Sequence, residues 1–397
     1  MQKIYNSKHL DVVLIIVSLY SIFFVFHKFI GGKIPFWDFH ITYCAAKNFF
    51  LGNFPYGLNV HENCLDPNIT LSVNYSPGTL ELIKYFGLIN ISFANFLWIF
   101  FEILSLLTIF YVLKKIYKFN YEWRNFLIFF FSFGGSIFIS FISGNVSVIL
   151  CGLLALGIFF LYKKFFNYYY LIVIFVSFFK FYYLSFLLIP FFLLGFKSLK
   201  KIFFSIILFI FVQYLFYINN PELTLAFLDV IQGKYGDVLP IRMQTGTGLY
   251  SIIEKMPAMI FESKSLIVSF SSLKINLLIW FILNLIILLS VFYCLHSKTI
   301  VTSKAYFLYC ISFGILSINL IIPRLVAYDL ILTIPVFFYL LNQINYEKLK
   351  INKFNIKYFF VFLFFVFFDH HFPFFMTIMF LTFFIYSEFY KKNYFIY

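Results

Sequence analysis

Long apolar runs recur along the chain, and short polar segments separate them. The first run extends from Leu10 to Ile30. Further single runs cover 94–113, 125–142, 146–162, 202–218, 273–295, 305–322 and 325–341. A helix of about 20 apolar residues spans the hydrocarbon core of a bilayer. The pattern therefore predicts a chain that crosses a membrane repeatedly as helices.

Two longer apolar stretches are interrupted near their middle by polar residues. Lys180 interrupts the stretch 168–196, and Asp369–His371 interrupts 358–390. We interpret each stretch as a pair of short helices that turn back at the polar residues. Together with the single runs, they predict an all-α polytopic membrane protein with roughly 10–12 transmembrane helices. These form one integral membrane domain over 1–397.

Basic residues are concentrated in alternate polar segments. They precede the first run and fill 114–124, 163–167, 197–201, 296–304, 342–357 and the C-terminal tail. Cytoplasmic loops of membrane proteins carry an excess of Lys and Arg. A single alternation of sides therefore places all these segments, and both termini, in the cytoplasm.

The composition agrees with a membrane protein and removes one competing explanation. Hydrophobic residues make up 62% of the chain and charged residues 12%, whereas soluble domains contain about 25% charged residues. The net charge of +14 would suit a nucleic-acid-binding protein, but its position in the cytoplasmic loops already accounts for it. We therefore expect membrane lipid, and no nucleic acid, as a partner.

Polar chemistry is expected on the opposite, outer face. Two long loops lie there, roughly 31–93 and 219–272, with near-balanced charge. The first loop contains two amphipathic stretches, Phe39–Leu51 and Thr79–Leu88, that are suited to the membrane interface. We expect the loops to cover the helices without forming a separate domain.

The five cysteines do not form a recognisable framework. Cys151, Cys294 and Cys310 lie in apolar runs, where cysteine acts as a small apolar residue. Cys44 and Cys64 share the first outer loop, and an oxidising compartment would allow them to pair. Spacing alone leaves that pairing open.

Asp38 is the acid of greatest interest, because it lies just beyond the first apolar run. One interpretation is an N-cap, since a helical pattern follows it and is closed by Gly52. A second interpretation is a general base toward a sugar or lipid hydroxyl at the membrane surface. The two are compatible, because a helix N-terminus also keeps a carboxylate ionised.

Other charged residues lie within or beside apolar runs. Lys180 and Arg324 are candidate ligands for a phosphate at the outer leaflet, or they anchor the chain at the interface. Asp329 is an acid within a span and a functional candidate by default, although it would also neutralise Lys180 or Arg324. Glu102 is equally costly to bury, and the sequence assigns it no role.

Metal and nucleotide chemistry find little support. The adjacent histidines of Asp369–His371 are poorly placed to bind one ion together, and no matching cluster stands out elsewhere. P-loop, Rossmann, G-x-S-x-G and H-E-x-x-H patterns are absent. We therefore expect no metal site and no cofactor, and we leave any metal requirement open.

Several short segments together resemble a known family of membrane enzymes. Trp37–Ala46 is similar to a D-F-x-x-Y-x-A-A segment, Gly52–Tyr56 to G-x-x-P-Y, and Asn74–Gly78 to a Y-P-P turn. Later matches are Gly144–Ser147 for G-Q-x-N, Lys180 for a hairpin lysine, Gly246–Ser251 for G-N-Q-S, and Pro323–Asp329 for S-P-R-x-x-x-Y-D. The chain thus resembles glycosyltransferase family 87, which has the GT-C architecture and includes polyprenyl-phosphate-mannose-dependent mannosyltransferases.

The resemblance implies an activity and a set of site residues. The enzyme would move a sugar, mannose first, from a polyprenyl-phosphate donor to a glycan, glycolipid or other hydroxyl acceptor, inverting the anomeric centre. It would act in cell-envelope synthesis at the outer face of the bacterial cytoplasmic membrane. Asp38 would be the catalytic base, and Lys180 and Arg324 would hold the donor phosphate. The residues that would contact substrate are His40, Tyr43, Tyr75, Asn145 and Asp329.

The sequence keeps a second function class open. Many helices, broken hairpins and intramembrane charges are also typical of a transporter or lipid flippase. The two long outer loops and the lack of a visible inverted repeat favour the enzyme. A transporter would depend on charges along its translocation path and would tolerate loss of Asp38, whereas an enzyme would not. A structural scaffold would need no buried acids.

Overall fold

A computed structural model provides the fold, and it describes most of the first 340 residues. The described residues are 8–30, 35–56, 64, 73, 75–118, 123–231, 250, 253, 273–296, 304–322, 327–336 and 339. Within these ranges the chain is helical and contains no strand. The α-helical class predicted from the apolar runs is therefore confirmed for this part of the chain.

Helices occupy the apolar runs with little displacement of their ends. The N-terminal elements are α2 (Lys8–Ile30), α3 (Trp37–Phe50), α4 (Pro77–Ile83), the 3₁₀ helix η2 (Lys84–Leu88), α5 (Ile91–Tyr117), α6 (Trp123–Ser143) and α7 (Ser147–Tyr162). The remaining elements are α8 (Phe166–Phe179), η3 (Phe181–Leu188), α9 (Ile189–Leu194), η4 (Gly195–Ser198), α10 (Leu199–Asn219), α11 (Pro221–Ile231), α14 (Leu273–His296), α15 (Lys304–Ile321) and η5 (Ala327–Leu332). The predicted run 358–390 lies outside the described residues.

Two helical segments of the described chain are long and apolar enough to cross a membrane. They are Ile91–Tyr117 and Phe181–Asn219, the latter made of η3, α9, η4 and α10. A third arises if the bent pair Trp123–Ser132 and Gly135–Ser143 is one span. Shorter apolar helices lie within α2, α7, α8, α14 and α15. Two or three spans are thus supported by length and composition, fewer than the sequence predicts.

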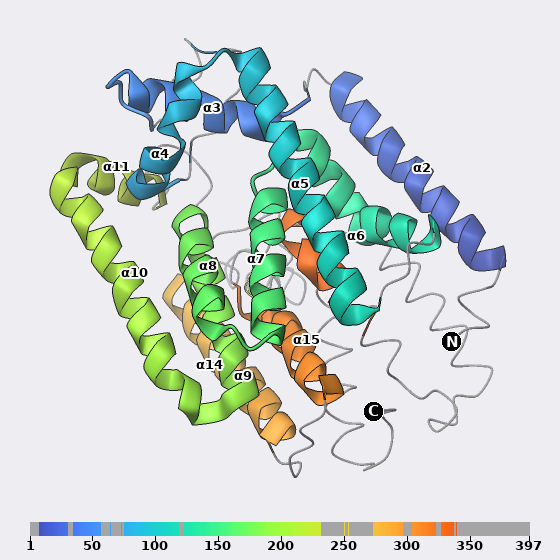
Figure 1. Ribbon diagram of the computed structural model, residues 1–397. Helices are drawn as coiled ribbons and strands as arrows, with labels where there is room; N and C mark the ends of the chain where they lie inside the picture. The colour runs from blue at the N-terminus through green and yellow to red at the C-terminus, as the bar shows by residue number, and fades with distance from the viewer. Residues whose placement is uncertain are drawn as a thin grey trace, which may run out of the picture.

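The amphipathic stretches Phe39–Leu51 and Thr79–Leu88 form a layer across one end of the bundle. Figure 1 shows α3 and α4 beside α11 at this end, and we call α3, α4, η2 and α11 the roof. Its apolar core is formed by Ile41, Ala45, Ala46, Tyr56, Val73, Leu80, Ile83, Ala226 and Val230. The Tyr56 hydroxyl donates to the Tyr75 carbonyl at 2.9 Å. Helices α3 and α4 therefore share an apolar core with α11.

A disulfide secures the roof. Cys44 of α3 is bonded to Cys64, and their Cα atoms are 5.7 Å apart. Cys44 itself is fully buried. The pairing that spacing left open is thus present, and it fastens the loop after α3 to the buried face of that helix.

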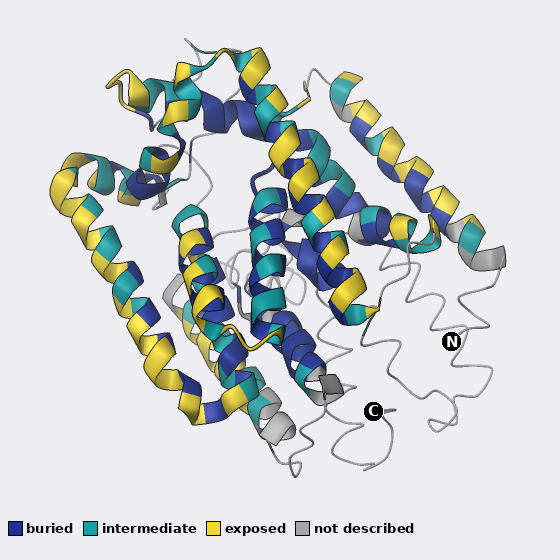
Figure 2. Cartoon of the chain, in the orientation of Figure 1, coloured by how far each residue is buried: buried dark blue, intermediate teal, exposed yellow. Residues whose placement is uncertain are grey.

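Beneath the roof, α7 and α15 occupy the centre of the bundle, and other helices surround them. Figure 2 shows that most of α7 and α15 is buried, whereas the outward sides of α2 and α10 are exposed. Those exposed sides carry large apolar residues such as Phe23 and Phe203. Extended apolar surfaces of this kind mark contact with a membrane or a partner.

The bundle contains the predicted hairpin at Lys180. The Lys180 backbone is extended, with φ −139° and ψ 98°, so it ends α8 and η3 begins at the next residue. The apolar run 325–341 differs from its prediction, because its described residues 327–332 form the 3₁₀ helix η5 and not a regular α-helix. Pro335 supplies a physical reason, since proline has no N–H and its ring clashes with the carbonyl four residues earlier.

Close approach of α5 and α7 requires glycine at one position. A Cβ atom at Gly152 would lie 2.5 Å from Cβ and 2.8 Å from Cα of Ser105. We predict that Gly152→Ala pushes these helices apart and lowers the free energy of unfolding by about 1–3 kcal/mol, as overpacking usually does. Thermal unfolding in detergent measures the effect.

Gly157→Ala is a matched control on the same helix. Its Cβ atom would meet side-chain atoms at 3.3 Å or more, which can shift slightly. An equal loss of stability in the two variants would contradict the predicted clash at Gly152.

The disulfide makes a separate prediction. Under denaturing but non-reducing conditions, a maleimide should label three of the five cysteines, because Cys44 and Cys64 are bonded to each other. Prior reduction should raise the number of labels to five, measured by intact mass. Five labels without reduction would show that the bond is absent.

Candidate functional site

Asp38 lies in the first turn of α3, where it faces a turn of the bundle. The residue before the helix is Phe36, with φ 63°, and no side chain caps the helix. The N-cap interpretation of Asp38 is therefore wrong. The Phe36 N–H donates to the Ile142 carbonyl at 2.9 Å, which fixes the start of α3 against the end of α6 and leaves the Asp38 side chain for other contacts.

The turn between α6 and α7 depends on Gly144. Its φ is +69°, and a Cβ atom there would lie 2.8 Å from the side chains of both Phe36 and Phe39. Glycine tolerates this backbone conformation and this contact. The Trp98 indole N–H donates to the Gly144 carbonyl at 2.9 Å. The turn is thus held from α3 and α5, and it presents the next residue to Asp38.

Asn145 connects Asp38 to the N-terminus of α7. Its side-chain amide donates to Asp38 Oδ2 at 3.0 Å, and its Oδ1 accepts from the Ser147 N–H at 3.0 Å. The two contacts use opposite ends of the amide group, so they fix its orientation. In this structure Asn145, predicted to contact substrate, therefore positions Asp38.

Asp329 is the centre of the polar cluster inside the bundle. Tyr182 donates to its Oδ2 at 2.9 Å, and Tyr183 and Ser147 donate to its Oδ1 at 3.1 and 3.0 Å. Lys180 forms an ion pair with Oδ1 at 2.8 Å. Lys180 Nζ also donates to the Ser147 hydroxyl. These donors come from α7 and from the hairpin between α8 and η3.

Lys180 and Asp329 neutralise each other's charge inside the bundle. The Asp329 side chain is 1% exposed and that of Lys180 is 14% exposed. Removing one partner of a buried pair is strongly destabilising, because the other charge is then uncompensated. Of the roles left open by the sequence, the structure shows that Asp329 neutralises Lys180, and phosphate binding by Lys180 stays a prediction.

The roof lies directly against this hairpin. The Thr79 hydroxyl of α4 donates to the Phe178 carbonyl in the last turn of α8. The hydroxyl of Ser76, the N-cap of α4, lies 3.4 Å from the same carbonyl oxygen. These contacts satisfy a carbonyl at the end of α8 that has no partner within the helix. They bring the roof to the helix end that Lys180 follows.

Three other predicted site residues, His40, Tyr43 and Tyr75, lie on or beside α3. The Tyr75 hydroxyl lies 3.4 Å from that of Thr42, and burial, chiefly, raises the pKa of Tyr75 to about 12. The Tyr43 hydroxyl donates to the Ile89 carbonyl at 2.9 Å, which joins α3 to the loop before α5. His40 is buried, and its burial lowers its pKa.

Two features noted in the sequence, Arg324 and Asp369–His371, lie outside the described residues. Within the part of the chain that is described, no group of three or more His, Cys, Asp or Glu side chains is placed to hold a metal ion. The contribution of Arg324 to the site therefore stays a prediction.

Sequence reasoning missed three members of the cluster. Ser147, Tyr182 and Tyr183 all donate to Asp329, yet none stood out as a site residue. The available signal was their position, since the two tyrosines lie two and three residues after Lys180 and the serine lies two residues after Asn145. Hydroxyl groups near a buried charge are natural hydrogen-bond donors to it.

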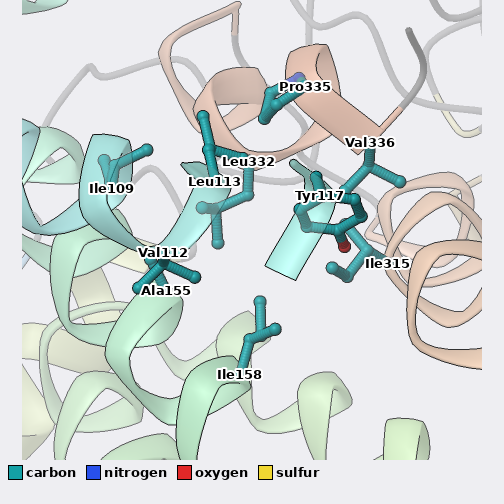
Figure 3. Close-up of a pocket in the computed structure, with 10 residues that line it drawn as sticks. All are labelled: Ile109, Val112, Leu113, Tyr117, Ala155, Ile158, Ile315, Leu332, Pro335 and Val336. Carbon is teal, nitrogen blue, oxygen red and sulfur yellow. The ribbon is translucent and has the colours of Figure 1, made fainter. Parts of the chain in front are cut away.

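An apolar pocket lies between α5, α7, α15 and η5 (Figure 3). It is lined by Ile109, Val112, Leu113, Tyr117, Ala155, Ile158, Ile315, Leu332, Pro335 and Val336. The Tyr117 hydroxyl is within 3.2 Å of the Ser312 hydroxyl. Because the other lining side chains are apolar, the pocket lacks the groups that would orient a sugar or a phosphate, and we assign the site to the Asp38–Asp329 cluster.

Glu102 of α5 has no comparable support. Its side chain is fully buried, and neither carboxylate oxygen has a hydrogen-bond partner among the described residues. The indole of Trp98, one turn away, donates to Gly144 instead. Burying a polar group without a partner costs about 1–3 kcal/mol.

We therefore predict that Glu102→Leu raises the unfolding temperature or leaves it unchanged. Asp11→Asn is the control, because Asp11 makes two hydrogen bonds with Arg124, at 2.6 and 2.8 Å, that join α2 to α6. That control should lower the unfolding temperature. A large loss of stability in Glu102→Leu would show that Glu102 has a stabilising partner.

Comparison with protein-family models, with curated proteins and with solved structures found no match. A functional assignment for this chain therefore rests on its own residues and their geometry. The features that carry it are a half-buried carboxylate on a roof helix and a buried lysine–aspartate pair, joined through the N-terminus of α7.

Proposed function

We propose that the chain is a membrane glycosyltransferase that moves a sugar from a polyprenyl-phosphate donor to a hydroxyl acceptor. The observation that carries this proposal is the link between a base and a cation. Asp38 accepts from Asn145, whose amide also binds the backbone of Ser147, and the Ser147 hydroxyl accepts from Lys180. One cluster thus contains the two charges that such a transfer needs.

The proposed reaction uses these charges at opposite ends of the transferred sugar. The acceptor hydroxyl gives its proton to the Asp38 carboxylate, and its oxygen bonds to the anomeric carbon. The bond from that carbon to the phosphate oxygen breaks, and the electron pair leaves with the phosphate. The attack from the opposite face inverts the anomeric centre. Lys180, with Arg324, offsets the charge that develops on the leaving phosphate.

The position of Asp38 suits two substrates of different solubility. It is half-buried on α3, where it accepts a hydrogen bond from Asn145 in the turn before α7. A lipid-linked donor would approach between the apolar helices, and a hydroxyl acceptor would approach from the roof. In this proposal His40, Tyr43 and Tyr75 line the sugar site, mannose is the first candidate sugar, and no cofactor takes part.

The proposed location follows from the same features. A disulfide in the roof is typical of an oxidising compartment, which favours the outer face for the roof. The positive-inside rule then places both termini in the cytoplasm. We propose a GT-C-like bundle of roughly 10–12 helices in the bacterial cytoplasmic membrane, acting in the synthesis of a cell-envelope glycan or glycolipid.

The Lys180–Asp329 pair also favours a second candidate function. Ion pairs inside a membrane domain mark substrate or proton pathways in transporters, and this pair is almost fully buried. A transporter or lipid flippase would depend on the pair and would tolerate the loss of Asp38. The glycosyltransferase depends on Asp38.

The test measures sugar transfer in membranes supplied with radiolabelled polyprenyl-phosphate mannose. We predict that Asp38→Asn lowers the transfer rate by about 100-fold or more, because an amide cannot accept the proton of the acceptor hydroxyl. Glu81→Gln is the matched control, since Glu81 is an acid of the same roof that pairs with Lys84 at 2.6 Å. It should keep the wild-type rate.

Two results would contradict the proposal in different ways. Transfer at the wild-type rate by Asp38→Asn would remove Asp38 from the mechanism. A wild-type protein that transfers sugar from no polyprenyl-phosphate donor would favour the transporter.

A further inference from the structure

We propose that Asp329 is a positioning residue that holds the Lys180 ammonium group ready for a phosphate, and that it does not itself contact the sugar. This inference deepens the proposed function and rests on it. It revises the expectation that Asp329 binds substrate. It also explains why a cation intended for a ligand is already paired in the structure.

The first observation is that the two side chains of the ion pair differ in exposure. The Asp329 side chain is 1% exposed, whereas Lys180 is 14% exposed. The Lys180 side chain is therefore the more accessible partner. A phosphate that reached the pair would meet Lys180 while Asp329 stayed behind it.

The second observation is the set of hydroxyl groups around Asp329. Ser147, Tyr182 and Tyr183 donate to its two oxygens in addition to Lys180. Hydrogen bonds to a charged group are among the stronger ones in proteins. The carboxylate is thus stabilised by three neutral donors, so it tolerates sharing the Lys180 charge with a phosphate.

The third observation is how closely the ammonium group is held. Lys180 Nζ lies 2.8 Å from Asp329 Oδ1, donates to Ser147, and sits 5.8 Å from the centre of the Tyr182 ring. Its backbone is fixed at the break between α8 and η3. Lysine is otherwise a flexible side chain with a single charged end. Asp329, Ser147 and Tyr182 surround the ammonium group and hold it in this position.

The same contacts set the position of Lys180 relative to Asp38. Ser147 donates to Asp329 through its hydroxyl and to Asn145 through its backbone N–H, and Asn145 donates to Asp38. A shift of Asp329 would therefore move Lys180 relative to Asp38. A sugar hydroxyl, by contrast, would have to displace one of the four donors that already occupy the carboxylate.

A double-mutant cycle tests the proposal. Purified protein in lipid nanodiscs is titrated with farnesyl phosphate by isothermal calorimetry, using wild type, Asp329→Asn, Lys180→Gln and the double variant. Each single variant should weaken binding by about tenfold or more, as the loss of a charged hydrogen bond does. The double variant should bind no more weakly than Lys180→Gln, because Asp329 acts only through Lys180.

Additive losses in the double variant would overturn the proposal, since they would mean that Asp329 contacts the ligand independently. Unchanged affinity in Asp329→Asn would overturn it as well. If the wild type does not bind farnesyl phosphate, both the proposed function and this inference fail. If it binds with additive losses, only the inference fails.

Milder variants keep the test informative if Asp329→Asn does not fold. Tyr182→Phe and Tyr183→Phe each remove one donor to Asp329, and each should weaken binding in the wild-type background but not in Lys180→Gln. Asp329→Glu keeps the charge and should retain more affinity than Asp329→Asn. Asp11→Asn, which breaks the distant ion pair with Arg124, should destabilise the protein without changing the affinity.

Discussion

The buried ion pair between Lys180 and Asp329 joins parts of the chain that are 149 residues apart. A charge in an apolar interior is costly without a counter-charge and further hydrogen bonds, and here α7 and the α8–η3 hairpin supply them. The hairpin, the start of α7 and η5 must therefore fold together. This constraint explains why so many polar side chains gather in one part of an otherwise apolar bundle.

The roof extends this constraint to one end of the bundle. Its α4 helix is joined to the end of α8 through the Phe178 carbonyl, and its α3 helix is joined to the turn before α7 through Asp38 and Asn145. The Cys44–Cys64 disulfide secures α3 in turn. Asp38 is thereby held between two layers of helices, an arrangement that suits the base of the proposed reaction.

Much of this arrangement was predictable from local sequence. Apolar runs located α5, α7, α10, α14 and α15 nearly to their ends, because polar segments bound each run and hydrophobic pattern is a local signal. Lys180 marked its hairpin, since a lysine seldom continues an apolar helix. Other expectations failed for reasons of context. Asp38 caps no helix because Phe36 is fixed by Ile142, and Asp329 lies in a 3₁₀ helix with Pro335 downstream.

The sequence alone determined that this chain is helical and apolar and that its scarce acids and bases include Asp38, Lys180 and Asp329, because composition and periodicity are local properties. Only the tertiary structure decided which of these groups meet. Asp38 and Asn145 are 107 residues apart, and pairings over such distances depend on how helices pack. The same packing brought Ser147, Tyr182 and Tyr183 onto Asp329, and these donors offset the free-energy cost of burying its carboxylate.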